Sequence, residues 1–323
     1  MNNLSHTLSL VKHGLKNYFM KRPYCVSFEV TYSCNAKCQH CHLGKIIPGE
    51  ERAAPEIFAE RCRELSPLVA QVSGGEPLLR NDVEEIVLSL KQKGRVPYIV
   101  LTTNGSLLTR EKYMKLLEAG VDSFSLSFDY PDERHDEFRG IPGLFQKIVS
   151  LLEATQNHKH KAITLSGVVQ RNNFRDLFKM AEFARKWDVK MNFSTYTWLR
   201  TQKKEFMIPK EELPELVEMI EKLQQHKRNF PTVVASDYVF KKMVEFFKNE
   251  TVPHCRAGER FLVVNPGGNL SPCGLIIKDY SCRNDLLHDF LKTNTCGECY
   301  TSIRANTEKP PRYLIRDSLR SLK

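Results

Sequence analysis

The sequence lacks any run of about 18 apolar residues, so no stretch of the 323-residue chain is predicted to cross a membrane as a helix. Its N-terminus lacks the short apolar core and small-residue cleavage site of a signal peptide, so we expect a cytoplasmic protein. Internal repeats and low-complexity segments are absent as well, which excludes solenoids and leaves an ordinary globular composition, with 41% hydrophobic and 27% charged residues.

The sequence also lacks a chain-wide charge bias, because the net charge of +10 resides mainly at the two ends. Residues 1–24 hold four basic and no acidic side chains, and residues 309–323 hold five basic side chains and one acidic. The nearly balanced middle argues against a nucleic-acid partner for the main body and directs any anionic contact to the ends.

Residues 1–22 combine basic charge with an apolar pattern at helical spacing, formed by Leu4, Leu8, Val11, Leu15 and Tyr18. A basic amphipathic helix of this kind can lie on an anionic membrane, which would place the protein peripherally on the inner membrane face. The favoured alternative is that the apolar stripe packs under the main fold and closes its base. The basic tail, residues 309–323, is predicted to lie at the surface.

Short apolar runs alternate with helical patterns through the middle of the chain. The expected strands are 26–32, 69–73, 97–102, 122–127, 162–169 and 189–196, and a helical pattern follows each of them. Six consecutive β–α units predict an α/β fold with parallel strands, a partial (β/α)6 TIM-like barrel. After residue 228 the pattern changes to a helix near 235–248 and two strand-like pieces around the turn 266–269, which predict a β-hairpin.

Ten cysteines are many for a chain expected in a reducing compartment, where metal binding or catalysis is commoner than disulfide formation. Cys34, Cys38 and Cys41 lie in the run CNAKCQHC, directly after the first predicted strand. Three thiolates can hold three corners of a cubane cluster and leave the fourth iron open for a ligand. A zinc site completed by a remote histidine is the alternative that the spacing leaves open.

Other polar motifs follow predicted strands: GGEP at 74–77, TTNG at 102–105, SFD at 127–129 and QRNN at 170–173. The carboxyl ends of parallel barrel strands meet on one rim, where the active site of such a barrel forms. Two glycines allow a backbone to approach a ligand closely, and Glu76 offers a carboxylate to an ammonium group. Taken alone, GGEP is equally well a tight turn between a strand and a helix.

Together, CNAKCQHC and GGEP resemble the motifs of the radical S-adenosylmethionine (SAM) enzymes, and the resemblance extends from about Tyr24 to Tyr196. The stretch SLSFDYPDERHDEFRG is similar to the family's fourth strand and the helix after it, whereas His40 stands where an aromatic residue is usual. The resemblance implies a 4Fe–4S cluster on the three loop cysteines, with SAM chelating the open iron. One electron, from a flavodoxin- or ferredoxin-type donor, would cleave SAM to a 5′-deoxyadenosyl radical that takes hydrogen from a substrate.

The resemblance also implies which residues bind the cofactor, although it assigns no catalytic residue. Eight residues are expected to do so: Gly74, Gly75, Glu76, Asn104, Ser127, Asp129, Arg139 and Asn173. Those of GGEP would receive the SAM amino group, and those of SFD would contact the ribose or the methionine moiety. The other three are equally turn or capping residues.

A second set of cysteines lies beyond the barrel: Cys255, Cys273, Cys296 and Cys299. Four thiolates can saturate a cluster, and a structural zinc site is equally compatible with the spacing. Cys255, followed by Gly268 and then Cys273, resembles the start of the SPASM pattern. No cysteine follows Cys299, so the set resembles the twitch extension, a shortened SPASM domain with one auxiliary 4Fe–4S cluster. We therefore expect the barrel in residues 23–228 and this iron–sulfur extension in residues 229–308.

The sequence leaves the substrate and the reaction open. A small molecule or lipid is favoured over a peptide, since only about 20 residues precede the first strand, too few for a leader-peptide-binding domain. A peptide-modifying SPASM-type maturase is the alternative within the family, and a non-catalytic iron–sulfur electron carrier or zinc-stabilised binding protein is the alternative of another class. Tyr196, Trp198, Arg200 and His254 either face the substrate or simply pack, so none of them is assigned.

Overall fold

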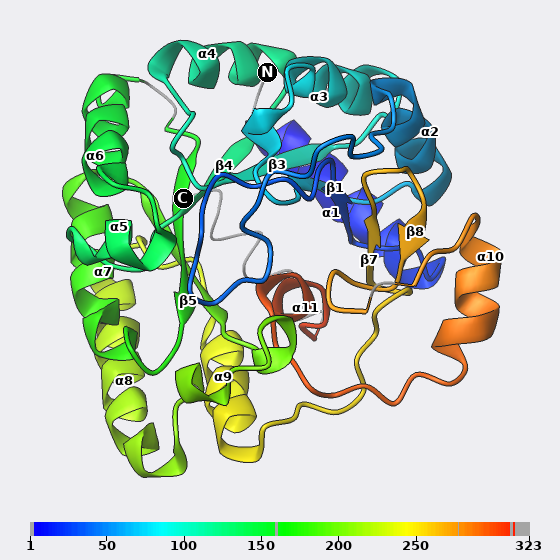
Figure 1. The fold of residues 1–323 in the computed structure, drawn as a ribbon. Helices are drawn as coiled ribbons and strands as arrows, with labels where there is room; N and C mark the ends of the chain where they lie inside the picture. The colour runs from blue at the N-terminus through cyan, green and yellow to red at the C-terminus, as the bar shows by residue number, and fades with distance from the viewer. Residues whose placement is uncertain (1–2, 159–160, 277, 311–312, 314–323) are drawn as a thin grey trace.

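One eight-stranded sheet forms the centre of the computed structural model, which describes residues 3–158, 161–276, 278–310 and 313 (Figure 1). The strand order is β6–β5–β4–β3–β2–β1–β7–β8. Neighbours from β6 to β7 are parallel, and β8 runs antiparallel to β7. The strands are β1 (Cys25–Glu29), β2 (Val69–Ser73), β3 (Tyr98–Thr103), β4 (Ser123–Ser127), β5 (Ile163–Val169), β6 (Lys190–Thr195), β7 (Phe261–Val264) and β8 (Leu270–Ser271).

Helices follow the first six strands in turn and cover the outer side of the curved sheet, as Figure 1 shows. They are α2 (Pro55–Leu65), α3 (Val83–Gln92), α4 (Arg110–Ala119), α6 (Leu144–Thr155), α7 (Leu177–Lys186) and α8 (Leu213–Asn229). The others are α1 (Asn3–Phe19), α5 (Arg134–Arg139), α9 (Asp237–Asn249), α10 (Arg283–Leu286) and α11 (Ser302–Thr307). The predicted partial barrel of six β–α units is therefore confirmed.

The strands alternate between two kinds of side chain, and this alternation positions the site. Val26 and Phe28 of β1 are fully buried, and the ring of Phe28 packs edge-to-face on Phe58 of α2, with centroids 6.2 Å apart. Ser27 and Glu29 of the same strand point the other way and line an internal cavity. Because successive strand side chains point to opposite faces, one face builds the core against the helices and the other lines the cavity.

The segment after α8 closes the open side of the sheet, which the sequence did not predict. The expected hairpin forms, with Asn265 N–H donating to Asn269 O at 2.8 Å, but its strand β7 also pairs in parallel with β1. At the other edge of the sheet, Ser302 N–H donates to Ser194 Oγ on β6 at 3.2 Å. The proposed extension, residues 229–308, thus bridges both edges of the barrel.

Helix α1 lies at the base of the barrel, but the expected apolar stripe does not pack there. The contact is polar: Asn17 is fully buried, and its Nδ2 donates to Pro23 O at 2.9 Å and to Ser66 O at 3.0 Å. Leu8 and Leu15 are 53% and 47% exposed. The favoured alternative is therefore wrong about the face, because the backbone carbonyls of Pro23, before β1, and Ser66, at the end of α2, hold the polar side of the helix. The Leu4 side chain and most of the tail 309–323 lie outside the described residues.

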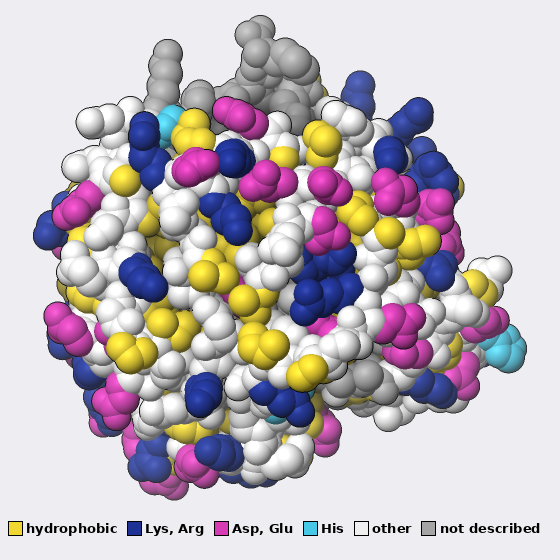
Figure 2. Space-filling model, turned by 45° about the horizontal axis from the view of Figure 1, so that its top comes forward, with side chains coloured by type: hydrophobic (Ala, Val, Ile, Leu, Met, Phe, Trp, Pro, Cys, Tyr) yellow, Lys and Arg dark blue, Asp and Glu magenta, His cyan; other side chains and the backbone are white. Residues whose placement is uncertain are grey.

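Surface charge is mixed over the face of the molecule that Figure 2 presents, where acidic and basic side chains alternate over short distances. Many of these charges form short pairs, such as Arg185 with Glu182 at 2.9 Å and Lys115 with Glu111 at 2.9 Å. Exposed pairs of this kind contribute little to stability, typically less than about 1 kcal/mol each. The described residues include no helix long and apolar enough to span a bilayer.

Candidate active site

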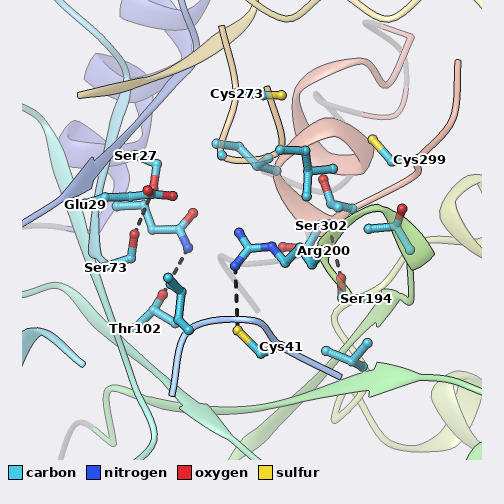
Figure 3. A pocket seen from close by; sticks show the side chains of 18 of the residues that line it. Ser27, Glu29, Cys41, Ser73, Thr102, Ser194, Arg200, Cys273, Cys299 and Ser302 are labelled. Atoms are coloured by element: carbon cyan, nitrogen blue, oxygen red, sulfur yellow. Dashed lines mark hydrogen bonds between the residues drawn. The ribbon is translucent and has the colours of Figure 1, made fainter. Parts of the chain in front are cut away.

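A cavity of about 350 Å³ lies inside the curved sheet, toward the carboxyl ends of the strands. All seven ligand-like cysteines line it, three from the CNAKCQHC loop and four from the second set. In Figure 3, Cys41 faces Cys273 and Cys299 across this pocket. Cys25 and Cys62, which belong to neither set, are buried in the core and do not line the cavity. Two sets that are more than 200 residues apart in the sequence therefore share one chamber.

Each thiol of the loop has one N–H group beside it. Ala36 N–H approaches Cys34 Sγ at 3.4 Å, and Arg139 Nη1 lies 3.5 Å from Cys38 Sγ. Arg200 Nη1 lies 3.9 Å from Cys41 Sγ. Burial raises the pKa of the Cys34 thiol to about 11, so ligation of a metal must displace its proton. Donors and two guanidinium groups at this loop favour the thiolate form that ligation requires.

The two glycines of GGEP allow the motif to dock against the cysteine loop. A Cβ atom on Gly74 would lie 2.1 Å from Thr31 O, and one on Gly75 would lie 2.2 Å from Ser33 O. Without side chains there, Gly75 N–H donates to Thr31 O at 2.7 Å and Glu76 N–H to Ser33 O at 2.9 Å. The glycines are thus needed for close approach between two backbones, and both also line the cavity.

Glu76 is fully buried and its carboxylate is engaged by the protein. Its Oε1 accepts from Leu78 N–H at 3.1 Å and from Thr103 Oγ1 at 2.7 Å, while Oε2 accepts from Asn104 N–H at 2.7 Å. Burial raises the pKa of this carboxyl above its ordinary value, and these donors oppose the rise. Glu76 therefore ties the GGEP turn to the end of β3, and its expected contact with a SAM amino group stays a prediction.

Asp129 and Arg139 form a buried pair that connects β4 with the cysteine loop. Arg139 Nε donates to Asp129 Oδ2 at 2.7 Å, and Val168 N–H donates to Asp129 Oδ1 at 2.9 Å. Asn173 Nδ2 donates to the backbone O of Asp129 at 3.2 Å. Burial raises the pKa of Asp129, but Arg139 and the other contacts outweigh it, so the net pKa lies below its ordinary value. Since the same guanidinium reaches Cys38, this pair orients the loop.

The eight expected cofactor residues divide into two groups in the structure. Five of them line the cavity: Gly74, Gly75, Asn104, Ser127 and Arg139. Glu76, Asp129 and Asn173 are fully buried behind it and bond to other protein groups. Asn104 Nδ2 also donates to Asn35 Oδ1 at 2.9 Å, which links TTNG to the cysteine loop.

His40 occupies a position where the family usually has an aromatic residue, and its imidazole stacks as an aromatic ring would. It stacks on Phe138, with centroids 4.9 Å apart and an angle of 17° between the planes. Burial, reinforced by nearby Arg139, lowers the pKa of His40 to about 3, so the imidazole is neutral near pH 7. Its Nδ1 is buried without a partner among the described residues. The ring therefore supports the loop through stacking and not through charge.

The four cysteines of the second set lie on the wall of the cavity. Cys255 N–H donates to Cys296 O at 3.2 Å, and a hydrogen bond joins their thiols, which lowers the pKa of Cys296 to about 6 and raises that of Cys255. Arg304 is fully buried beside them, and its Nη1 donates to Cys299 O at 2.6 Å. Their shared role as ligands stays a prediction, and no sequence motif indicated the arginine beside them.

Residues 28–184 match the family described as the Radical SAM superfamily. This region, residues 28–184, belongs to the radical SAM superfamily. The matched region contains the cysteine loop, GGEP, and the ends of β3, β4 and β5. Membership implies a 4Fe–4S cluster and SAM as cofactors.

Relatives of this radical SAM protein include enzymes with different names. An AdoMet-dependent heme synthase of Oleidesulfovibrio alaskensis is 27% identical over 81% of this chain and 72% of its own length. The antilisterial bacteriocin subtilosin biosynthesis protein AlbA of Bacillus subtilis is 24% identical over 83% of this chain and 58% of AlbA. Two further proteins named AdoMet-dependent heme synthase are covered over only 47% and 48% of their length.

A solved structure shows the same fold over nearly all of the radical SAM protein described above. Streptococcus suis SuiB bound to S-adenosylmethionine matches 98% of this chain and 72% of that chain, with a TM-score of 0.61. At 15% sequence identity this likeness establishes the fold alone.

The donor set of the radical SAM protein fits iron–sulfur clusters better than single metal ions. Among the residues that the structure describes, no three His, Cys, Asp or Glu side chains are arranged to hold one metal ion. Zinc draws its sulfur ligands to about 2.3 Å from one centre. A cubane cluster instead spreads its cysteine ligands around a group several atoms across, which suits thiols distributed along a cavity wall.

Two charged residues line this cavity that the sequence did not assign: Glu29 was missed, and Arg200 was named without a role. Glu29 ends β1 and Arg200 ends the short 3₁₀ helix Trp198–Arg200, and both line the cavity, as does Tyr196. Trp198 and His254 do not line it. The signal that identifies Glu29 is the alternation of polar and apolar residues along CVSFE, which places its side chain on the same face as Ser27.

Proposed function

We propose that the protein reductively cleaves SAM at a 4Fe–4S cluster held by Cys34, Cys38 and Cys41, and that it abstracts hydrogen from a small organic substrate. The bound cluster and SAM would supply the 5′-deoxyadenosyl radical chemistry. The observation that carries the proposal is the single cavity lined by this loop, by Gly74 and Gly75, and by the second cysteine set. Three thiols at the loop leave a fourth position free, which is where SAM would chelate.

The residues of the chain position the cofactors and exclude water. The GGEP backbone holds the cysteine loop in one arrangement, because Gly75 N–H and Glu76 N–H donate to backbone carbonyls at the start of that loop. Arg139 provides positive charge to Cys38 while its own position is set by buried Asp129. A preorganised set of this kind lowers the reorganisation needed during reaction and protects a radical from solvent.

We further propose that Cys255, Cys273, Cys296 and Cys299 hold one auxiliary 4Fe–4S cluster. Four thiols on the wall of the same cavity support this assignment, and four cysteine ligands would leave no iron open. A saturated cluster favours electron transfer over direct binding of substrate. A flavodoxin- or ferredoxin-type protein is the proposed external donor.

The cavity favours a polar small molecule, or the polar part of a lipid, as substrate. Its wall carries hydroxyl and amide side chains from successive strands, including Ser27, Gln71, Thr102, Ser166 and Asn192. Peptide modification is the alternative outcome of a substrate search.

The proposal is tested by anaerobic reconstitution and reduction with dithionite. Wild-type protein should bind about eight iron atoms, the content of two cubane clusters, and release 5′-deoxyadenosine from SAM. Cys34→Ala should abolish the release, whereas Cys282→Ala, outside the cavity-lining set, should retain it. Release by Cys34→Ala at the wild-type rate would overturn the assignment of the loop. An iron content of about four atoms per chain in the wild type would refute the proposed auxiliary cluster.

Peripheral membrane contact through α1 is also proposed, because its outward face combines apolar and basic residues. Leu8 and Leu15 are about half exposed, Phe19 is 78% exposed, and Lys12 and Lys16 are exposed beside them. Such a face suits an anionic bilayer, whereas the lysines would repel a second copy of the helix. Leu15→Glu should reduce sedimentation with phosphatidylglycerol vesicles, and His13→Gln, on the inward side, should not. Equal sedimentation of wild type and Leu15→Glu would remove this proposal.

A further inference from the structure

Glu29 and Arg200 place opposite charges beside each other inside the cavity. A Cβ atom built on Gly274 would lie 2.7 Å from Glu29 Oε1 and 3.2 Å from Arg200 Nη2, so both groups flank the backbone directly after Cys273. Arg200 also lies beside Cys41 of the first set. Figure 3 shows its guanidinium in the middle of the pocket, between Cys41 and the cysteines of the second set.

The neighbouring polar side chains of the wall bond to one another, whereas Glu29 and Arg200 do not bond to each other. Ser27 Oγ and Ser73 Oγ are 2.8 Å apart, and Gln71 Nε2 donates to Thr102 Oγ1 at 3.0 Å. In the described part of the chain, Glu29 and Arg200 form no ion pair with each other, and neither bonds to a carboxylate or ammonium group. Among the described residues, the Arg200 side chain contacts Cys41 Sγ, so both charged groups face the cavity without an oppositely charged hydrogen-bond partner.

The two charged residues come from other elements than the expected SAM residues, although Glu29 at the end of β1 pairs with Ser73, directly before GGEP. Gly74, Asn104 and Ser127 approach the loop from β2, β3 and β4, whereas Glu29 comes from β1 and Arg200 from the segment after β6. The pair borders the second cysteine set through Gly274. A substrate between the two sets would therefore meet Arg200 and Glu29, while SAM would occupy the side of GGEP.

We infer that Arg200 and Glu29 form the substrate-recognition pair of this cavity, with Arg200 binding a carboxylate and Glu29 accepting from an amino group of the substrate. The inference rests on the proposed function, because it assumes that SAM occupies the loop side. The planar guanidinium matches a carboxylate in a bidentate geometry that lysine does not reproduce. The substrate class is thus a compound with a carboxylate and, within reach of it, a hydrogen-bond donor.

Three small probes test this inference on the reconstituted holoprotein: glutarate, its diamide glutaramide, and 4-aminobutyrate. Binding is measured as broadening of the probe's proton NMR lines. Wild-type protein should bind glutarate and 4-aminobutyrate and not glutaramide. Arg200→Gln should weaken the binding of both carboxylate probes at least tenfold, which corresponds to about 1.4 kcal/mol. Arg200→Lys should recover part of this lost affinity. Glu29→Gln should weaken the binding of 4-aminobutyrate but strengthen the binding of glutarate.

These opposite effects distinguish recognition from a merely structural role, which would weaken every probe alike. Arg171→Gln, a substitution in an exposed pair with Glu212, serves as the matched control and should bind all probes as the wild type does. Saturating SAM should leave glutarate bound. Displacement of glutarate by SAM, equal binding of glutarate and glutaramide, or no binding of glutarate would each overturn the inference. Release of 5′-deoxyadenosine by the wild type reports on the proposed function separately.

Discussion

Replacing Glu76 by glutamine should destabilise the protein even without SAM. The carboxylate accepts three hydrogen bonds in a fully buried site, two at Oε1 and one at Oε2 from Asn104 N–H. In Glu76→Gln one oxygen becomes an NH₂ group, so either Asn104 N–H or Leu78 N–H faces a donor. An unsatisfied buried N–H costs roughly 1–3 kcal/mol, and a bond to a charged acceptor contributes about 1.5–3 kcal/mol. Relief from burying a charge offsets part of this, which leaves a net loss of about 2 kcal/mol.

Urea unfolding of the metal-free protein, without SAM, measures this loss directly. A net loss of about 2 kcal/mol moves the unfolding midpoint by about 1 M if the slope is about 2 kcal/mol/M. The control Glu60→Gln changes an exposed glutamate on α2 and should stay within about 0.5 kcal/mol of the wild type. If Glu76→Gln unfolds like the wild type but binds SAM more weakly, Glu76 serves the cofactor directly and its support of the β3 turn is refuted.

Other substitutions test the loop and its surroundings. Gly75→Ala places a methyl group 2.2 Å from Ser33 O, so it should cost about 1–3 kcal/mol by urea unfolding and lower iron uptake, whereas Gly14→Ala meets its nearest heavy atom at 3.6 Å and should do neither. His40→Phe preserves a ring to stack on Phe138 and should retain iron binding, while His40→Ala should lose part of it; equal iron content in both variants would show that stacking is irrelevant. Asp129→Asn removes the charge paired with Arg139 and should decrease stability at pH 7 by about 3 kcal/mol, with the difference from wild type shrinking as the pH falls through the depressed pKa of Asp129.

The β–α architecture was predictable because the order of polar and apolar residues within each short segment indicates a strand or a helix. Alternating residues in CVSFE, SFSLS and ITLSGVV marked strands, and the motifs after them met on one rim because parallel strands share a direction. Ligand-like spacing indicated two cysteine sets, but it did not indicate that both sets line one cavity. Each of the predicted features depends on neighbours in the sequence or on the general geometry of a β–α barrel.

The remaining features depend on long-range contacts that no local pattern encodes. The pairing of β7 with β1 joins Cys25 to Phe261 across more than 230 residues. The inward face of α1 follows from the carbonyl of Ser66, which holds Asn17, and not from the apolar stripe. The buried roles of Glu76 and Asp129 arise from backbone donors on other strands. Sequence motifs identified these residues as important but did not distinguish cofactor contacts from supports.

The most direct test of the account is SAM cleavage by the anaerobically reconstituted protein, with iron content measured on the same samples. We predict 5′-deoxyadenosine release by the wild type and none by Cys34→Ala, Cys38→Ala or Cys41→Ala. Cys273→Ala should lose about half of the iron while its loop still binds a cluster. Release of 5′-deoxyadenosine that is unchanged in all three loop variants would show that this loop does not hold the SAM-cleaving cluster.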